Sequence, residues 1–221
     1  MDAHRALQGW GGTSPSVATV HTAGDDTELV RLVTEAGQRG ILGRGLGRSY
    51  GDAAQNGGGV VLDMTSRNRV LSVDTEAAVV EVEAGVSLDQ LMRLMPPLGL
   101  FAPVSPGTRQ VTVGGAVAAD IHGKNHHVDG SFGRHVLSMD LLCADGTIRT
   151  LTPESELFWA TVGGMGLTGL VLRATLRMKK VESAYCLVDT ERCVNLDELL
   201  ERMAEGDHRY TYSVAWIDCL A

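Results

Sequence analysis

A glycine- and arginine-rich stretch, LGRGLGRSYGD at residues 42–52, carries the residue types best suited to chemistry in this sequence. Alternating glycines let a backbone adopt positive φ and approach a ligand closely. Successive N–H groups in such a loop can form a concave site for phosphate oxygens. Arg44 and Arg48 could add fork-shaped donors to the same anion. The stretch therefore predicts a loop that wraps a diphosphate.

The same loop comes close to the dinucleotide-binding pattern G-x-G-x-x-G, with Gly43, Gly45 and Ser49 in the key positions. That pattern requires a helix immediately after the loop, because the helix N-terminus receives the pyrophosphate. Here the loop leads into QNGGG at residues 55–59, a turn signal, and then into a strand-like run at residues 60–64. We therefore expect a loop between two strands. For the glycines alone, an ordinary surface loop is the competing interpretation.

A second informative stretch, residues 103–133, contains a run of very small residues, GGAVAA at 114–119. A helix of glycine and alanine has little side-chain bulk, so a flat ligand or another backbone can approach it closely. For this run alone, close packing against protein is the more ordinary explanation. His122 follows the run and is placed to face a ligand. A third glycine loop, GGMGLTG, occupies residues 163–169.

The histidines His122, His126 and His127 raise the possibility of a metal site. They lack an H-E-x-x-H pattern, and Asp120 and Asp129 flank them without ligand spacing. We expect no metal, and we interpret His126 and His127 as loop residues.

The elements that must position these loops indicate an α+β fold. Apolar alternation and β-branched residues predict strands at residues 17–22, 41–42, 60–64, 70–73, 79–82, 136–143, 148–151, 170–178, 184–189 and 210–217. Helices are expected from Asp25 or Asp26 to about Gly40, and over residues 88–95, 156–162 and 196–204. Ser87 and Asn195 are candidate N-caps.

Composition narrows the function classes. The chain has 221 residues and a formal net charge of −8, which argues against a general nucleic-acid binder. No apolar run approaches the ~20 residues of a membrane span, and residues 1–13 lack the apolar core of a secretory signal peptide. The four cysteines form no C-x-x-C pair, so we expect free thiols.

The three glycine loops, in this order, resemble the flavin-binding domain of the vanillyl-alcohol-oxidase, or p-cresol-methylhydroxylase (PCMH), superfamily over residues 15–182. The resemblance implies a two-subdomain PCMH-type FAD-binding domain at residues 1–182. The beginning of a second α+β domain, which binds substrate, would follow at residues 183–221 and stop short of its full length. It also implies that the first loop wraps the FAD diphosphate, that the second stretch runs along the flavin, and that the third loop supports the adenosine side.

The resemblance also assigns roles to matching positions. His122 and Tyr50 would lie nearest the reacting substrate. The cofactor would be held by Gly43, Arg44, Gly45, Leu46, Gly47, Arg48, Ser49, Tyr50, Gly51, Ala53, Gly107, Thr108, Thr112, Val113, Gly114, Gly115, Ala119, Asp120, Ile121, His122, Gly123, Met165, Gly166 and Val171. Superfamily members with covalent flavin usually have histidine where this chain has Arg48, so the FAD is expected to be non-covalent.

Several motifs resemble more closely those superfamily members that oxidise the 2-hydroxyl of a polyprenyl-phosphate-linked ribose. These motifs are RGLGRSYGD, AQNGGG, GKNHH, ELFWATVGGMGLTG and RYTYSVAW. It implies a separate NAD-dependent keto-reductase partner that completes epimerisation to the arabinose form for cell-wall arabinan. We expect a soluble protein that works at a membrane surface or in the cell envelope. The alternatives are another sugar, alditol or aldonolactone oxidase of the superfamily, and an FAD-binding fragment without turnover.

Overall fold

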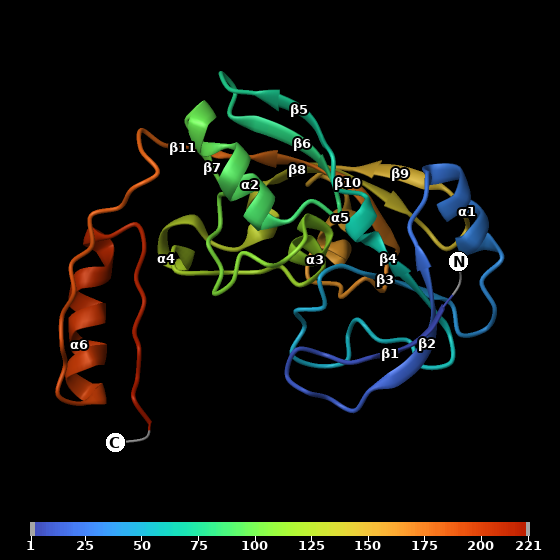
Figure 1. Ribbon diagram of the computed structural model, residues 1–221. Helices are drawn as coiled ribbons and strands as arrows, with labels where there is room; N and C mark the ends of the chain where they lie inside the picture. The colour runs from blue at the N-terminus through green and yellow to red at the C-terminus, as the bar shows by residue number, and fades with distance from the viewer. Residues whose placement is uncertain (1–2, 220–221) are drawn as a thin grey trace.

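The computed structural model describes residues 3–219, which form two β-sheets, the helices packed on them and a C-terminal arm (Figure 1). The first sheet has the strand order β1-β2-β4-β3. Its strands are β1 (Ala3–Leu7), β2 (Ser16–Thr22), β4 (Val60–Asp63) and β3 (Ile41–Arg44). β2 and β3 both run parallel to β4, whereas β1 pairs antiparallel with β2 and was not predicted. The glycine loop therefore leaves an edge strand, β3, and returns to the neighbouring β4.

The helix α1 (Asp26–Thr34) connects β2 to β3. The carboxylate of Asp25 caps it by accepting from the N–H of Glu28, and Leu29 is fully buried on its inner face. The predicted end near Gly40 is wrong, because the last helical residue is Thr34. The Thr34 hydroxyl donates back to the carbonyls of the preceding turn, and Gly37, a poor helix former, follows.

The second sheet is antiparallel throughout and has the order β5-β6-β10-β8-β9. Its strands are β5 (Val70–Asp74), β6 (Val79–Glu83), β10 (Leu170–Arg177), β8 (Val136–Leu142) and β9 (Ile148–Leu151). All five were predicted from the alternation of apolar residues. Gly146, with φ of +79°, makes the tight turn between β8 and β9.

Short helices cover this sheet: α2 (Leu88–Leu94), α3 (Val113–Ala118), α4 (His126–Asp129) and α5 (Glu156–Thr161). The 3-10 turns are η1 (Met64–Ser66), η2 (Pro96–Leu98), η3 (Phe132–His135) and η4 (Asp207–Arg209). A small ribbon joins β7 (Leu100–Phe101) to β11 (Lys179–Lys180). The main core lies between the sheet and these helices, with Leu91, Val117 and Phe158 fully buried in it.

A partly buried ion-pair network joins α1 to the second sheet. Arg67, which follows η1, contacts Asp26 of α1 at 2.6 Å and Glu83 of β6 at 3.7 Å. Arg69 contacts the same Glu83 at 2.8 Å, and Arg173 of β10 pairs with Asp26. The network therefore links α1, which belongs to the first sheet's β-α-β unit, to β6 and β10 of the second sheet.

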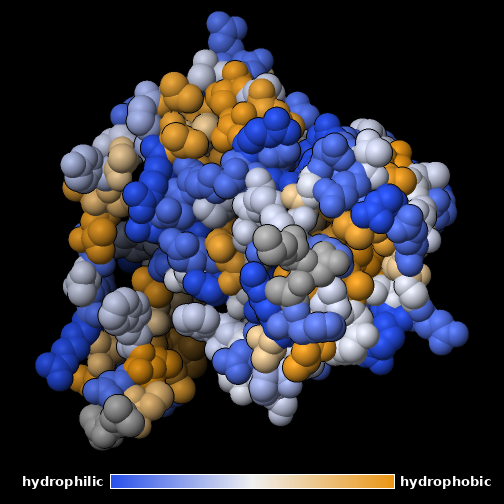
Figure 2. Space-filling view, turned by 45° about the vertical axis from the view of Figure 1, so that its right-hand side comes forward, coloured by the Kyte–Doolittle hydropathy of each residue, from blue (hydrophilic) through white to orange (hydrophobic). Residues whose placement is uncertain are grey.

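The C-terminal arm, residues 183–219, consists of α6 (Leu196–Gly206) and η4 between two extended segments (Figure 1). The arm exposes hydrophobic residues, and Figure 2 shows hydrophobic surface at its lower left, where the arm lies. The strands predicted at residues 184–189 and 210–217 are wrong, because these segments are not paired in a sheet. A segment rich in β-branched and aromatic residues forms a strand only where a neighbouring strand supplies a ladder of hydrogen bonds, and within the described chain neither segment lies in such a ladder. The arm is tied to the body through Ser213, whose N–H donates to the Lys124 carbonyl at 2.8 Å.

Candidate functional site

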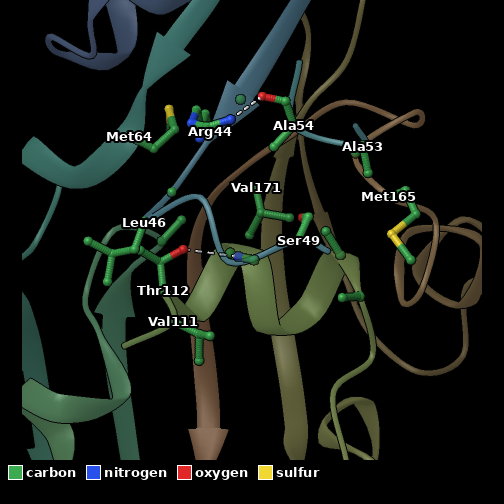
Figure 3. A pocket seen from close by; sticks show the side chains of 18 of the residues that line it. Arg44, Leu46, Ser49, Ala53, Ala54, Met64, Val111, Thr112, Met165 and Val171 are labelled. Atoms are coloured by element: carbon green, nitrogen blue, oxygen red, sulfur yellow. Dashed lines mark hydrogen bonds between the residues drawn. The ribbon is translucent and has the colours of Figure 1, made fainter. Parts of the chain in front are cut away.

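A crevice of about 180 Å³ lies between the edge of the first sheet and the open side of α3 (Figure 3). The loop after β3 crosses above α3, while Val171 of β10 and Met165 of the third glycine loop complete the walls. The three stretches singled out in the sequence therefore meet in one place. The lining consists of Gly43, Arg44, Gly45, Leu46, Gly47, Arg48, Ser49, Ala53, Ala54, Met64, Ala84, Val111, Thr112, Gly114, Gly115, Ala118, Ala119, Ile121, Thr161, Met165, Gly166, Gly169, Leu170 and Val171.

Two glycines of the first loop are required by its close contacts. A Cβ atom at Gly45 would lie 2.3 Å from the Thr112 hydroxyl, the group that caps α3 by accepting from the N–H of Gly115. Gly47 has φ of +66°, and a Cβ atom there would lie 2.4 Å from the Arg44 guanidinium. The loop can thus lie directly against the start of α3 because Gly45 has no side chain, and Gly47 gives the loop the positive φ that other residues rarely adopt.

The backbone of this loop offers a run of available donors. Within the described chain, none of the N–H groups of residues 45–51 donates a hydrogen bond to another protein group. Backbone N–H groups seek partners, and a run of them along a glycine loop is suited to phosphate oxygens. The loop therefore fits a diphosphate by its backbone.

The Arg44 guanidinium serves the loop rather than a free anion site. It donates to the Ala54 carbonyl at 2.7 Å and to the Gln8 carbonyl at 2.9 Å, and so joins the two ends of the loop to the N-terminal segment. Burial lowers the pKa of Arg44, and the charge of Asp63 opposes this shift. Arg48 donates to the Leu46 carbonyl at 2.7 Å.

The small residues of α3 have two different uses. A Cβ atom at Gly114 would lie 3.0 Å from the Cβ of Ala84 in the turn after β6, so this glycine allows α3 to pack closely against that turn. At Gly115 the only near neighbour of such a Cβ is the Thr112 hydroxyl, at 3.2 Å. Close packing against protein thus holds at Gly114, and at Gly115 the surface of α3 stays open enough for a ligand to approach.

The crevice opens into a second, wider hollow of about 620 Å³, called the mouth below. The two share Arg48, Val111, Ala119 and Ile121. The mouth is lined by Trp10, Arg48, Tyr50, Pro106, Gly107, Thr108, Gln110, Val111, Ala119, Ile121 and His122. Tyr50 is 78% exposed, and the His122 ring meets that of His126 edge to face at 5.4 Å. Both predicted substrate-side residues thus lie at the mouth.

Some predicted cofactor residues lie outside both hollows, namely Gly51, Val113, Asp120 and Gly123. Val113 is fully buried in the core. The Asp120 carboxylate accepts from the Gly133 N–H at 2.8 Å, and Gly123 packs against the Ser105 carbonyl. These residues shape the walls from behind.

Sequence reasoning missed several lining residues. Ala84, Thr161 and Leu170 come from a turn, a helix and a strand and carry no local signal, because only the tertiary fold brings them together. Trp10 was also missed, although its place between glycines in the segment GWGG at residues 9–12 is a local pattern that could have indicated a close contact with a ligand or loop.

The interpretation of His126 and His127 as loop residues is wrong, because both lie in the short helix α4. The histidine run does not form a metal cluster in the described chain. No group of three or more His, Cys, Asp or Glu side chains within residues 3–219 is arranged to hold an ion. The four cysteines are free thiols. Among the described helices, none has the length and apolarity required to cross a membrane.

Comparison with known proteins gives one family and several relatives. Residues 16–152 match the FAD binding domain family. The decaprenylphosphoryl-beta-D-ribose oxidase of Mycolicibacterium smegmatis is 55% identical over 98% of this chain and 49% of its own length. An alditol oxidase from a Streptomyces species is 28% identical over 79% of this chain and 42% of its length. The L-gulonolactone oxidase of Mus musculus is 29% identical over 89% of this chain and 45% of its own length. The chain therefore spans about half the length of these relatives.

Proposed function

Because this chain belongs to the FAD binding domain family, we propose that its crevice holds FAD without a covalent bond and serves an oxidoreductase acting on a sugar hydroxyl. The observation that carries the proposal is the crevice itself. Its first loop has a run of free backbone donors, its floor is made of glycine and alanine, and it opens beside Tyr50 and His122.

Different parts of the lining suit the diphosphate, the flavin ring system and the adenosine of FAD. The N–H groups of residues 45–51 would hold the diphosphate. The open surface of α3 at Gly115 and Ala119 would lie along the flat ring system, and Met165 of the third loop would face the adenosine side. Arg48 occupies the position where covalent members of the superfamily have histidine. A guanidinium cannot form that bond, which supports non-covalent binding.

When bound, FAD supplies the acceptor for a hydride from the substrate carbon. The protein must hold the sugar and manage the proton of its hydroxyl. Tyr50 and His122 line the mouth from different segments, so both can hydrogen-bond a substrate that enters there. Their contribution is orientation, because a fixed geometry supplies a large part of a barrier reduction.

The substrate we propose is a ribose joined through phosphate to a polyprenyl chain, oxidised at its 2-hydroxyl to the 2-keto form. The support is the 55% identity to an oxidase named for decaprenylphosphoryl-ribose. A separate NAD-dependent keto-reductase would reduce the product to the arabinose epimer used for cell-wall arabinan. Because the substrate carries a lipid, we also propose that the protein works at a membrane surface.

We also propose a domain division. Residues 1–182 would form the FAD-binding domain, and the arm that follows would begin a substrate-binding domain. The arm supports this division because its apolar side chains, including Leu187 and Trp216, are exposed rather than packed on the body.

The test uses the purified chain mixed with FAD and freed of excess cofactor by gel filtration. We expect the visible flavin band to co-elute with the protein, and acid precipitation to leave the flavin in the supernatant. A chain that elutes without the band would refute the cofactor proposal, and flavin in the acid pellet would refute non-covalent binding. Anaerobic bleaching of the bound flavin in the full-length protein by a prenylphosphoryl ribose, but not by an alditol or an aldonolactone, tests the substrate.

A further inference from the structure

The N-terminal segment at residues 8–12, called the strap below, lies directly on the first glycine loop. The N–H of Trp10 donates to the Ser49 carbonyl at 2.7 Å, and the N–H of Gly11 donates to the Tyr50 carbonyl at 3.1 Å. The contact is so close that a Cβ atom at Gly9 would lie 2.1 Å from the Gly51 oxygen. The strap precedes residues 16–152, so the family match does not account for it.

The strap places an aromatic ring against Arg48. The Arg48 guanidinium lies over the indole of Trp10 at 4.7 Å from the ring centre, and it donates to the Leu46 carbonyl at 2.7 Å. A stack and a hydrogen bond restrict this side chain from two sides. Arginine has five N–H donors, so most of its donors have no partner among the described residues.

The position of this guanidinium is informative because Arg48 lines both the crevice and the mouth. Neither lining contains an aspartate or a glutamate, although the chain has 27 acidic residues against 19 lysines and arginines. Within the mouth lining, Arg48 is the one side chain with a permanent positive charge. The lining of the mouth therefore carries no acidic side chain and one permanent positive charge, that of Arg48.

We propose that Arg48, positioned by Trp10, forms an anion-selecting subsite at the mouth that takes the phosphodiester of the sugar substrate. This inference rests on the proposed function. Trp10 is a positioning residue, since it acts through Arg48. The diphosphate of the cofactor has the free N–H groups of the first loop, and the Arg48 donors remain for the charged group of the substrate.

The test measures selectivity, which a purely structural role would not change. Equilibrium dialysis with the FAD-loaded chain compares a short-chain prenylphosphoryl ribose with the neutral prenyl riboside that lacks the phosphate. We expect the wild type to prefer the anion by about tenfold or more, as a charge-assisted hydrogen bond provides. Arg48→Gln should abolish the preference. Trp10→Leu should reduce it by about two- to fivefold, the size of a cation–π contact, while Trp10→Phe keeps most of it.

Trp159→Leu is the matched control, because this half-exposed tryptophan lines neither hollow, and the preference should stay at the wild-type value. Thermal unfolding checks that every variant is folded. No preference in the wild type, or an unchanged preference in Arg48→Gln, would overturn the proposal. An unchanged preference in Trp10→Leu would overturn the positioning role. The flavin band is recorded separately from the dialysis. A chain that takes up no FAD refutes the proposed function, whereas an FAD-loaded chain without the anion preference refutes the subsite alone.

Discussion

Two neighbouring glycines of α3 show how single residues can be assigned separate roles. Both line the crevice, but Gly114 also packs against Ala84 in the turn after β6, whereas Gly115 is close only to the Thr112 hydroxyl that caps α3. A side chain at the first position would press on protein, and one at the second would enter the space for the ligand. The two substitutions therefore separate folding from binding.

We predict that Gly115→Val weakens FAD binding by about tenfold or more, because overpacking a contact surface costs ~1–3 kcal/mol. Its unfolding temperature should stay near that of the wild type. Gly114→Val should lower the unfolding temperature as well, since its Cβ already lies 3.0 Å from that of Ala84. Flavin fluorescence titration and calorimetry measure the two quantities.

The control for both glycine variants is Gly37→Ala, at a position with open space around the added Cβ. It should leave FAD affinity and unfolding temperature unchanged. If Gly115→Val binds FAD as the wild type does, the ring system does not lie along α3 and the assignment of the crevice fails.

At the scale of elements, the network of Asp26, Arg67, Glu83 and Arg173 holds α1 against the second sheet. Glu83 is only 3% exposed and accepts from Arg69 through its backbone N–H and its guanidinium. The side-chain hydrogen bond from Arg69 lowers the pKa of Glu83 below its ordinary value. Burial opposes this shift, and the charge of Arg67 assists it.

Because the pKa of Glu83 is lower in the folded protein than in the unfolded chain, the direction in which its contribution to stability changes with pH is defined. Glu83 contributes stability above the unfolded-state value of ~4.3, and the contribution is lost as the pH falls through the folded-state pKa. We predict that Glu83→Gln lowers the free energy of unfolding at neutral pH by ~1–3 kcal/mol, because it removes the charged acceptor of the Arg69 hydrogen bonds, while Arg67 keeps its ion pair with Asp26. Its stability should also fall less steeply than that of the wild type below about pH 4.

Urea unfolding from pH 3 to pH 7 measures both effects. Glu35→Gln is the matched control, because Glu35 pairs with Arg31 in an exposed pair on the surface of α1, where the change should stay within ~0.5 kcal/mol. Parallel pH curves for the wild type and Glu83→Gln would show that Glu83 does not titrate with a lowered pKa in the folded protein.

Local signals predicted the elements of the body well. The alternation in β8 and β10, the Asp25 and Ser87 caps and the three glycine loops are encoded within a few residues, so the sequence indicates them directly. The strands predicted at residues 184–189 and 210–217 failed because strand formation depends on a partner that no local pattern reports. The partners of Arg44 were missed for the same reason, since Gln8 and Ala54 reach it only through the fold.

At the scale of the whole molecule, the body and the arm differ in how their apolar residues are used. In the body, residues such as Phe158 and Leu172 are fully buried between sheets and helices. In the arm, Trp216 is 91% exposed, and Leu187 and Val194 are also exposed. The arm lies beside the body in Figure 1 and contributes little to its core.

The arm is attached by few contacts. Ser213 donates to the Lys124 carbonyl, His127 contacts the Tyr210 carbonyl at 2.9 Å, and Lys179 lies 5.3 Å from the Tyr212 ring.

We predict that a chain shortened to residues 1–182 unfolds cooperatively, with an unfolding temperature within a few degrees of that of the full 221 residues, and binds FAD equally well. The reason is that exposed side chains contribute little to the free energy of unfolding, usually within ~0.5 kcal/mol each. Calorimetry and flavin titration of the two chains make the comparison, with Phe158→Ala as the contrasting variant. That substitution empties a fully buried site and should cost ~3–5 kcal/mol. Loss of cooperative unfolding in the shortened chain would show that the arm belongs to the same folding unit as the crevice, and the division at residue 182 would then be wrong.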